Sequence, residues 1–270
     1  MLERFMRYPG FLTKAITLSY DDNTDHDRKM VEMLNRCGLK CTFNINSGRL
    51  GQPGRIREDE VVDLYKGHEI AVHGLTHPHL DNLSVGQAAY QILEDRKNLE
   101  RILNHPVEGM AYPFHIPEDP VYVEAVKNCS MRYARVTEST YRFGLPSDYL
   151  RWCPTCHHAE PELPGLVEKF LQPDDIEHPW RITCRLLYVW GHSYEYEDHW
   201  EDLEKLCKLL SGYDNVWYAT NGEIIDYIIA YRQLRTSVDG TMLYNPTATT
   251  LYTSINNRNY IIPPGETLYI

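Results

Sequence analysis

Residues 15–23 read Ala-Ile-Thr-Leu-Ser-Tyr-Asp-Asp-Asn. The first six form a short apolar run typical of a buried β-strand, and two carboxylates and an amide follow at its end. Similar runs recur along the chain, separated by segments with helical spacing of apolar residues. The predicted strands are 15–20, 41–45, 69–73, 109–113, 132–136, 184–190 and 215–220. Strands that alternate with helices indicate parallel βαβ units, so the sequence predicts an α/β fold in which seven units form a closed or nearly closed (β/α) barrel.

The predicted helices begin at residues that can cap a first turn. Ser84 with Gln87, and Thr220 with Glu223, have capping-box spacing. Asp119 precedes a proline, which is favoured at the first helical position. The predicted helices are 25–37, 58–66, 84–104, 119–128, 161–171, 199–210 and 220–234.

The pattern of the sequence changes after Arg235, where the alternation of strands and helices ends. Residues 236–270 combine several turn signals with short alternating runs, which predict three or four short strands. So small a β unit is marginal alone, so we expect it to pack on the barrel. The predicted organisation is a barrel domain over residues 1–235 and a β-rich C-terminal extension over residues 236–270.

Composition excludes several classes of protein. The chain has 270 residues, of which 43% are hydrophobic and 24% charged, which are globular values. With 27 basic and 38 acidic residues the net charge is −11, so we expect no binding to nucleic acid or to anionic membranes. No signal-peptide pattern or membrane-spanning run is recognisable, and an odd count of seven cysteines suits reduced thiols. We therefore expect a cytoplasmic protein.

Cys153, Cys156 and His157 form a Cys-x-x-Cys-His string, the pattern of c-type haem attachment and of half a zinc ribbon. No second cysteine pair exists to complete a ribbon, and haem attachment would normally accompany export. We therefore favour local packing, with a metal role for His157 or His158 as the alternative.

Polar side chains of metal-binding and acid–base type follow several predicted strands. They are Asp21 and Asp22 after the first strand, His73 and His77 after the third, residues 112–115 (Tyr-Pro-Phe-His) after the fourth, Arg135 at the end of the fifth, and Trp190 and His192 after the sixth. Reactive groups gather at the carboxyl ends of barrel strands, so we expect these side chains at one rim. His73 and His77 have metal-ligand spacing, and two histidines with one carboxylate leave positions open for water and substrate, as in catalytic metal sites.

These motifs resemble those of the polysaccharide deacetylases, the NodB-homology or carbohydrate esterase family four. The family pattern Thr-Phe-Asp-Asp-Gly corresponds to residues 19–23, Ser-Tyr-Asp-Asp-Asn. The pattern His-Ser/Thr-x-x-His-Pro corresponds to residues 73–78, and Leu-x-Leu-x-His to residues 188–192. Order and strand placement match from about Lys14 to Arg235. The resemblance implies the family's distorted (β/α) barrel with seven strands, in agreement with the strand pattern.

The resemblance also implies roles for the residues at the rim. Asp22, His73 and His77 would hold one divalent metal ion, expected to be zinc, although nickel, cobalt and iron tolerate the same ligands. Asp21 would be the general base and His192 the general acid of a hydrolysis in which the metal activates water. The residues expected to bind substrate or stabilise the oxyanion are Tyr112, Pro113, Phe114, Arg135 and Trp190, with His115 as a further candidate lining residue.

The sequence departs from the family pattern at three places. Asn23 replaces glycine, no arginine precedes Tyr112, and the family's Asp-x-x-Asp-Trp motif is absent. The missing arginine would pair with the base and tune its pKa. Arg135 could supply that charge, or it could form a surface salt bridge.

The expected function is metal-dependent removal of acetyl groups from an N-acetylated sugar or glycan precursor, with O-acetylated sugars as the secondary expectation. Two alternatives stay open: hydrolysis of a small non-sugar amide on the same barrel, and carbohydrate binding by a barrel without activity. The sequence indicates no oligomeric state.

Overall fold

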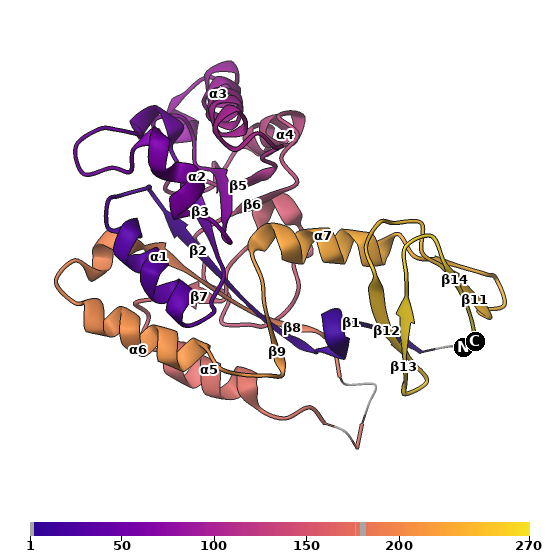
Figure 1. Cartoon of the computed structure of the whole chain (residues 1–270). Helices are drawn as coiled ribbons and strands as arrows, with labels where there is room; N and C mark the ends of the chain where they lie inside the picture. The colour runs from indigo at the N-terminus through magenta and orange to yellow at the C-terminus, as the bar shows by residue number, and fades with distance from the viewer. Residues whose placement is uncertain (1–2, 176, 179–181) are drawn as a thin grey trace.

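The computed structural model describes residues 3–175, 177–178 and 182–270. Its main strands are β2 (Lys14–Asp21), β3 (Cys41–Ile45), β4 (Glu69–Val72), β5 (Gly109–Ala111), β6 (Tyr133–Arg135), β7 (Cys156–His157), β8 (Arg185–His192) and β9 (Val216–Tyr218). Within the described residues they form one sheet in the order β6-β5-β4-β3-β2-β8-β7, with β9 paired to β2, and every pairing is parallel. The seven predicted strands are all present, β7 is an addition, and the distorted (β/α) barrel is confirmed (Figure 1).

β2 is the central strand, and all eight of its residues are buried. It pairs with β8 along its whole length, from Lys14 opposite Arg185 to Asp21 opposite His192. Its other edge is shared, because β9 pairs with its first half and β3 with its second half. A strand with neighbours on both edges and both faces covered has the near-continuous apolar sequence seen in residues 15–20. This register places Asp21 and His192 side by side at the carboxyl rim.

Residues 152–157 join the two ends of the sheet. The backbone N–H of Trp152 donates to the carbonyl of Ala134 at 3.0 Å, and Trp152 O accepts from Val136 N at 3.1 Å, so this residue lies along β6. Further on, Thr155 N donates to the carbonyl of Tyr188 at 2.8 Å, beside β8. The Cys-x-x-Cys-His string therefore lies in an extended segment that bridges β6 and β8. Neither of its cysteines forms a disulfide, and local packing stays the prediction for this string.

Seven α-helices among the described residues cover the sheet. They are α1 (Asp27–Arg36), α2 (Val61–Leu64), α3 (Val85–Leu103), α4 (Pro120–Asn128), α5 (Leu163–Leu171), α6 (Trp200–Leu210) and α7 (Asn221–Arg232). In Figure 1, α3 and α4 lie together at one end of the sheet, and α1, α5 and α6 lie on another side. The predicted caps of α3, α4 and α7 are present, with Ser84, Asp119 and Thr220 each accepting a backbone N–H. The predicted helix 58–66 is shorter, because a 3-10 turn takes up its first residues.

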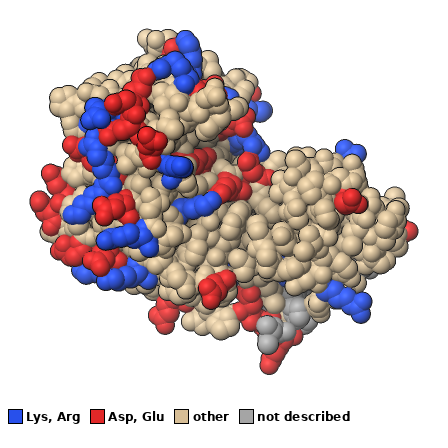
Figure 2. Space-filling view, viewed as in Figure 1, with Lys and Arg blue, Asp and Glu red and all other residues tan. Residues whose placement is uncertain are grey.

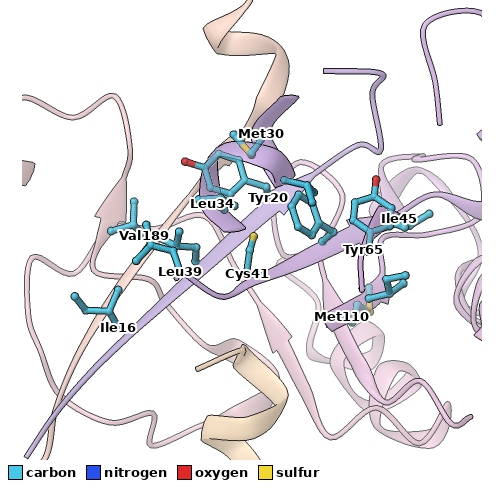
Figure 3. Close-up of a cluster of buried hydrophobic side chains, with 14 of the residues drawn as sticks. Ile16, Tyr20, Met30, Leu34, Leu39, Cys41, Ile45, Tyr65, Met110 and Val189 are labelled. Carbon is cyan, nitrogen blue, oxygen red and sulfur yellow. The ribbon is translucent and has the colours of Figure 1, made fainter. Parts of the chain in front are cut away.

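The main core lies between the sheet and these helices. α1 presents Met30 and Leu34 to β2 and β3, where Tyr20 and Cys41 are also fully buried. Figure 3 shows Met30 and Leu34 beside Tyr20, with the side chains of neighbouring strands continuing the cluster. Burial of each large apolar side chain contributes about 1.5–3 kcal/mol, so this packing holds β2, and the carboxylates at its end, in place.

The C-terminal extension is more elaborate than expected. Five strands follow Leu234 in the described residues: β10 (Arg235–Thr236), β11 (Met242–Tyr244), β12 (Leu251–Ile255), β13 (Arg258–Ile262) and β14 (Thr267–Tyr269). An unpredicted N-terminal strand, β1 (Arg4–Arg7), pairs with β12, giving two antiparallel sheets ordered β1-β12-β13 and β10-β11-β14. Tyr227 of α7 donates its hydroxyl to the Arg7 carbonyl at 2.5 Å, which ties these sheets to the barrel. The division into domains at residue 235 stays a prediction.

Charge is unevenly distributed over the two parts. Figure 2 shows acidic and basic side chains crowded over the barrel and few on the face of the extension in that view. Residues 236–270 contain only three charged side chains, Asp239, Arg258 and Glu266. No helix among the described residues is both long enough and apolar enough to cross a membrane.

Candidate active site

The predicted catalytic and metal-binding residues meet at the carboxyl rim of the sheet, around a cavity of about 310 Å³. The cavity is lined by Asp21, Asp22, His73, His77, Tyr112, Phe114, Thr137, Trp190, His192 and Tyr194. Pro113, Arg135 and His115 are the predicted residues that do not line it, whereas Thr137 and Tyr194 line it without having been predicted. The structure thus brings together groups from β2, β4, β5 and β8 that are far apart in the sequence.

Asp22, His73 and His77 form a cluster that fits a divalent metal ion. One ligand atom from each lies within 4.8 Å of the others, and His77 Nε2 is 3.6 Å from Asp22 Oδ1. Asp22 Oδ1 and His73 Nε2 are buried, and neither has a hydrogen-bond partner in the described part of the chain. Buried polar atoms normally have a partner. Two imidazole nitrogens and a carboxylate oxygen are also a donor set that zinc accepts, so the residues fit such an ion.

His73 is held in the orientation that a metal ligand needs. Its Nδ1 lies 2.9 Å from the carbonyl oxygen of Ala111, and its backbone N–H donates to Asp95 Oδ2 at 3.0 Å. A proton on Nδ1 that is donated to the carbonyl leaves the Nε2 lone pair free. Asp95 also accepts from Ser47 N at 2.6 Å, and burial raises the pKa of this carboxyl to about 7.

His77 and Asp22 both lie in left-handed backbone conformations, with φ of 59° and 82°. Burial, with the adjacent charge of His73, lowers the pKa of His77 to about 4. The ring is therefore neutral near pH 7, which is the form that binds a metal ion.

Asp21 is buried beside a full positive charge. Its Oδ1 accepts from Asn44 Nδ2 at 2.8 Å, and its Oδ2 accepts from Arg135 Nη2. Burial alone would raise the pKa of Asp21, but Arg135 and the nearby His73 outweigh it and lower the pKa. The carboxylate is therefore ionised at neutral pH and lies 3.6 Å from His73 Nε2.

Arg135 does not contact the cavity, although it was expected among the substrate-binding residues. Its side chain is 0% exposed, and its guanidinium lies 4.4 Å from the centre of the Trp190 ring. This burial also excludes the surface salt bridge that the sequence left open. Arg135 contacts Asp21 from outside the cavity. It is therefore in a position to supply the positive charge of the arginine that the family motif has and this sequence lacks.

Two other predicted residues lie outside the cavity. Pro113 packs against Gly74, where an added Cβ would come within 3.2 Å of the proline ring. The exposed His115 instead pairs with Asp81 through Nε2 and Oδ2 at 3.0 Å.

Asn23, which stands where the family pattern has glycine, lies in a left-handed turn. It has a φ of 40°, in the left-handed region that asparagine enters more readily than most residues. Its side-chain Oδ1 accepts the backbone N–H of Asn46 at 3.0 Å. Asparagine therefore suits the turn after the acid pair, and its side chain joins that turn to the loop after β3.

His192 is held by Glu195, a residue that the sequence analysis did not identify. Glu195 Oε2 accepts from His192 N at 3.0 Å and lies 3.3 Å from His192 Nδ1. Burial opposes charge on this imidazole, but the Glu195 contact and the charge of Asp21 raise the pKa of His192. The same Oε2 lies 3.2 Å from His157 Nε2 and 3.3 Å from His158 Nε2.

Sequence signals existed for some of the missed residues. Asp95 lies on the apolar stripe of α3 together with Ala88, Ile92 and Leu99, so it is a carboxyl on a buried face. Glu195 follows His192 at capping-box spacing, which the structure shows to be present. Its contacts with His157 and His158 have no local signal, because those residues lie in and directly after β7, far from Glu195 in the sequence.

Comparison with known proteins bears on this arrangement. The polysaccharide deacetylase family model matches residues 11–134. A family 4 carbohydrate esterase from Streptomyces lividans, solved with acetate, is 11% identical, with a TM-score of 0.53 over 77% of this chain and 93% of that chain. The Xyl-CE4 domain of a xylanase from the hindgut metagenome of Trinervitermes trinervoides is 14% identical, with a TM-score of 0.54 over 80% and 92%.

A family 4 pseudoenzyme from Bacillus anthracis also has this fold, at 18% identity and a TM-score of 0.51, over 82% of this chain and 68% of that chain. The comparison with curated proteins found no match. At these identities the solved structures show the fold, and the family match rests on the segment that contains Asp21, Asp22, His73 and His77. The resemblance read from the motifs is thus confirmed: residues 11–134 match the polysaccharide deacetylase family, and the fold that carries them is that of the family 4 carbohydrate esterases.

Proposed function

We propose that this chain is a metal-dependent hydrolase that removes acetyl groups from an N-acetylated sugar or glycan precursor, with O-acetylated sugars as secondary substrates. One observation carries the proposal. The ligand cluster Asp22–His73–His77, the ionised Asp21 and the imidazole of His192 all line one cavity. A catalytic metal position, a base and an acid around a single space are the groups that hydrolysis of an acetyl group requires.

Each residue has a distinct task in this reaction. A divalent ion held by Asp22, His73 and His77, expected to be zinc, would supply Lewis acidity toward water and an acetyl oxygen. Asp21 accepts the proton of the attacking water, and Arg135 and Asn44 keep its carboxylate in place. His192 lies opposite Asp21 in the strand register and donates a proton to the departing nitrogen or oxygen.

Aromatic side chains support a sugar as the substrate. Phe114, Trp190 and Tyr194 line the cavity, and such rings offer apolar faces together with polar edges. Tyr194 stacks against His192 with ring centres 5.0 Å apart, so it can hold a sugar beside the acid. We expect backbone N–H groups near Phe114 to bind the developing oxyanion.

A barrel that binds carbohydrate without turnover is the second candidate. It is favoured by the similarity to a pseudoenzyme of the same fold and by the absence of the family's Asp-x-x-Asp-Trp motif. Saccharide affinity that is unaffected by a chelator, without release of acetate, would support this candidate.

Acetate release from a panel of acetylated sugars, with and without chelator, tests the proposal. We expect release from at least one N-acetylated sugar, loss of release with chelator, and recovery when zinc, nickel, cobalt or iron is restored. Release from small non-sugar amides alone would assign the barrel to that other substrate class. Release that continues in full with chelator present would contradict metal dependence.

Two variants separate the roles within the site. Asp21→Asn should retain the metal and lose at least about 100-fold in kcat, because general-base catalysis contributes about 10²–10⁴-fold. His73→Ala should lose the metal bound in the cavity. Unchanged turnover in Asp21→Asn would remove Asp21 as the base.

A cytoplasmic location is part of the same proposal, and cell fractionation tests it.

A further inference from the structure

A second cluster of metal-binding side chains lies outside the cavity. His79 and Asp81 follow β4 in the loop before α3, and His115 follows β5. One ligand atom from each of the three lies within 4.8 Å of the others. Two histidines and a carboxylate from two different loops therefore converge at one point on the rim.

His79 is held in place without using its ring nitrogens. Its ring stacks on that of Phe114, with centres 3.6 Å apart and an angle of 4° between the planes. Phe114 has a φ of 62°, and its ring also contacts His77, at 4.4 Å between centres. Neither ring nitrogen of His79 makes a hydrogen bond to any part of the chain that the structure describes. The imidazole is thus oriented by stacking, and its lone pair is available to a cation.

His115 and Asp81 complete the donor set. His115 Nε2 lies 3.0 Å from Asp81 Oδ2, and the two side chains are 47% and 39% exposed. An exposed ion pair of this kind contributes only about 0–1 kcal/mol, so little stability opposes its rearrangement around an ion. Exposure also leaves room for water at the remaining coordination positions, as zinc sites with three protein ligands require.

The cluster of His157, His158 and Glu195 does not offer the same chemistry. His157 Nδ1 accepts the backbone N–H of Ala159 at 3.2 Å, so the neutral ring carries its proton on Nε2. That Nε2 therefore donates to Glu195 Oε2 at 3.2 Å, and the ring cannot move its proton to Nδ1 without losing the Ala159 hydrogen bond. The ring of His115 also contacts a carboxylate through Nε2, but no hydrogen bond in the described contacts fixes its Nδ1. Stacking leaves both ring nitrogens of His79 free of hydrogen bonds in the described contacts. This difference favours the cluster of His79, Asp81 and His115 as the metal-binding one.

We propose that His79, Asp81 and His115 form a second divalent-metal site, of zinc type, at the rim of the cavity and separate from Asp22–His73–His77. The ion links the loop after β4 to the loop after β5. These loops carry His77 and Phe114, so a metal at the rim restrains one wall of the cavity. The site stands on its own residues and does not depend on the proposed deacetylase reaction.

Metal stoichiometry of untagged, full-length protein tests the site. The protein is stripped with chelator, equilibrated with zinc, and its bound metal measured by elemental analysis. We expect two zinc ions per chain in the unmodified protein and one in His115→Ala or Asp81→Asn. His105→Ala removes another exposed histidine, outside the cluster, and should keep two.

Variants of the two clusters distinguish failure of this site from failure of the proposed function. His73→Ala should keep one zinc ion, and His73→Ala combined with His115→Ala should bind one fewer than either single variant. If His115→Ala and Asp81→Asn both bind as much zinc as the unmodified protein, the rim site does not exist. If His73→Ala loses no metal while His115→Ala loses one ion, the rim site stands and the cavity assignment fails.

Discussion

Asp21 and Arg135 are an ion pair in which both side chains are almost fully buried, at 3% and 0% exposure. A buried charge is tolerated when its partner is present, and loss of one partner leaves the other desolvated and uncompensated. The pair joins the end of β2 to the end of β6, so it also holds two distant strands together. Arg135 is therefore a positioning residue that acts through Asp21.

We expect Arg135→Met to lower the free energy of unfolding by about 3–5 kcal/mol, because Asp21 is left as an unpaired buried charge. In an Asp21→Asn background the same substitution should cost much less. Urea unfolding of the four proteins in this double-mutant cycle measures the difference. Equal costs in both backgrounds would show that Arg135 stabilises the fold by packing alone.

Asp27 at the start of α1 is a second buried carboxyl, without a cationic partner in the described contacts. It accepts from Tyr65 Oη at 2.6 Å and from Ser193 Oγ. Burial raises its pKa to about 7, although both hydrogen bonds oppose the shift. The folded protein therefore keeps Asp27 protonated at a pH where the unfolded chain has already released that proton.

The sign of the resulting pH dependence follows by linkage. An acid whose pKa is raised in the fold contributes full stability below about pH 4, the unfolded value, and loses it as the pH rises toward 7. We expect Asp27→Asn to remove a decline of a few kcal/mol over this range, since the amide resembles the protonated acid. Unfolding free energies of both proteins from pH 4 to 8 provide the measurement. Parallel curves for the two proteins would contradict the raised pKa.

Among the secondary-structure elements, β8 carries His192, the proposed acid, and its position depends on one glycine. Gly191 lies directly before His192, and a Cβ at this position would overlap the ring of His158. The His158 ring itself is packed between Tyr20 and Tyr196, with ring centres 5.6 and 4.5 Å away, so it has little freedom to move. The absence of a side chain at Gly191 thus allows the ring of His158 to lie against β8.

We expect Gly191→Ala to destabilise the protein by about 1–3 kcal/mol, the usual cost of overpacking a rigid core. The substitution should also lower kcat, because a shift of β8 moves His192. Combining Gly191→Ala with His158→Ala removes the overlap, so the added methyl group should then cost little relative to His158→Ala alone. The test measures the free energy of unfolding by chemical denaturation, and kcat, for the three variants. If Gly191→Ala costs as much stability in the His158→Ala background as in the unmodified protein, overlap with His158 is not the cause of the destabilisation.

In the whole molecule, a strand near the N-terminus joins a sheet of the C-terminal extension. β1 pairs with β12 over Arg4–Arg7 and Tyr252–Ile255. A second apolar core lies between these strands and α7, with Tyr8, Tyr227 and Leu251 among its buried residues. The extension is therefore stabilised by the opposite end of the sequence as well as by the barrel.

We expect a chain beginning at Tyr8 to be less stable by about 2–4 kcal/mol, because one or two large apolar side chains would lose their cover at about 1.5–3 kcal/mol each. Amide hydrogen exchange should accelerate in β12 and much less in β2. Removal of residues 1–2 alone, which leaves β1 intact, is the matched control. Unchanged exchange in β12 would show that β1 contributes nothing to the extension.

Much of this architecture follows from local sequence patterns. Apolar runs of strand length, capping boxes at Ser84 and Thr220, and polar residues just beyond the strands were sufficient to predict the barrel and its reactive rim. The meeting of the carboxyl ends of parallel strands at one edge placed Asp22, His73 and His77 at a common rim, and the resemblance to the deacetylase motifs grouped them as metal ligands. These features depend on neighbours within a few residues and on a period that the sequence displays directly.

Other features required the tertiary structure. The pairing of Arg135 with Asp21 and the convergence of His157 and His192 on Glu195 join residues from separate units. So do the closure of the sheet by residues 152–157 and the addition of β1 to the C-terminal sheet. The periodicity of apolar residues predicts which residues are buried. It does not predict which strand lies beside which, because strand order depends on how all the apolar faces pack together. For this protein, local sequence therefore specifies the elements and the polar residues at their ends, whereas the packing decides which charges meet.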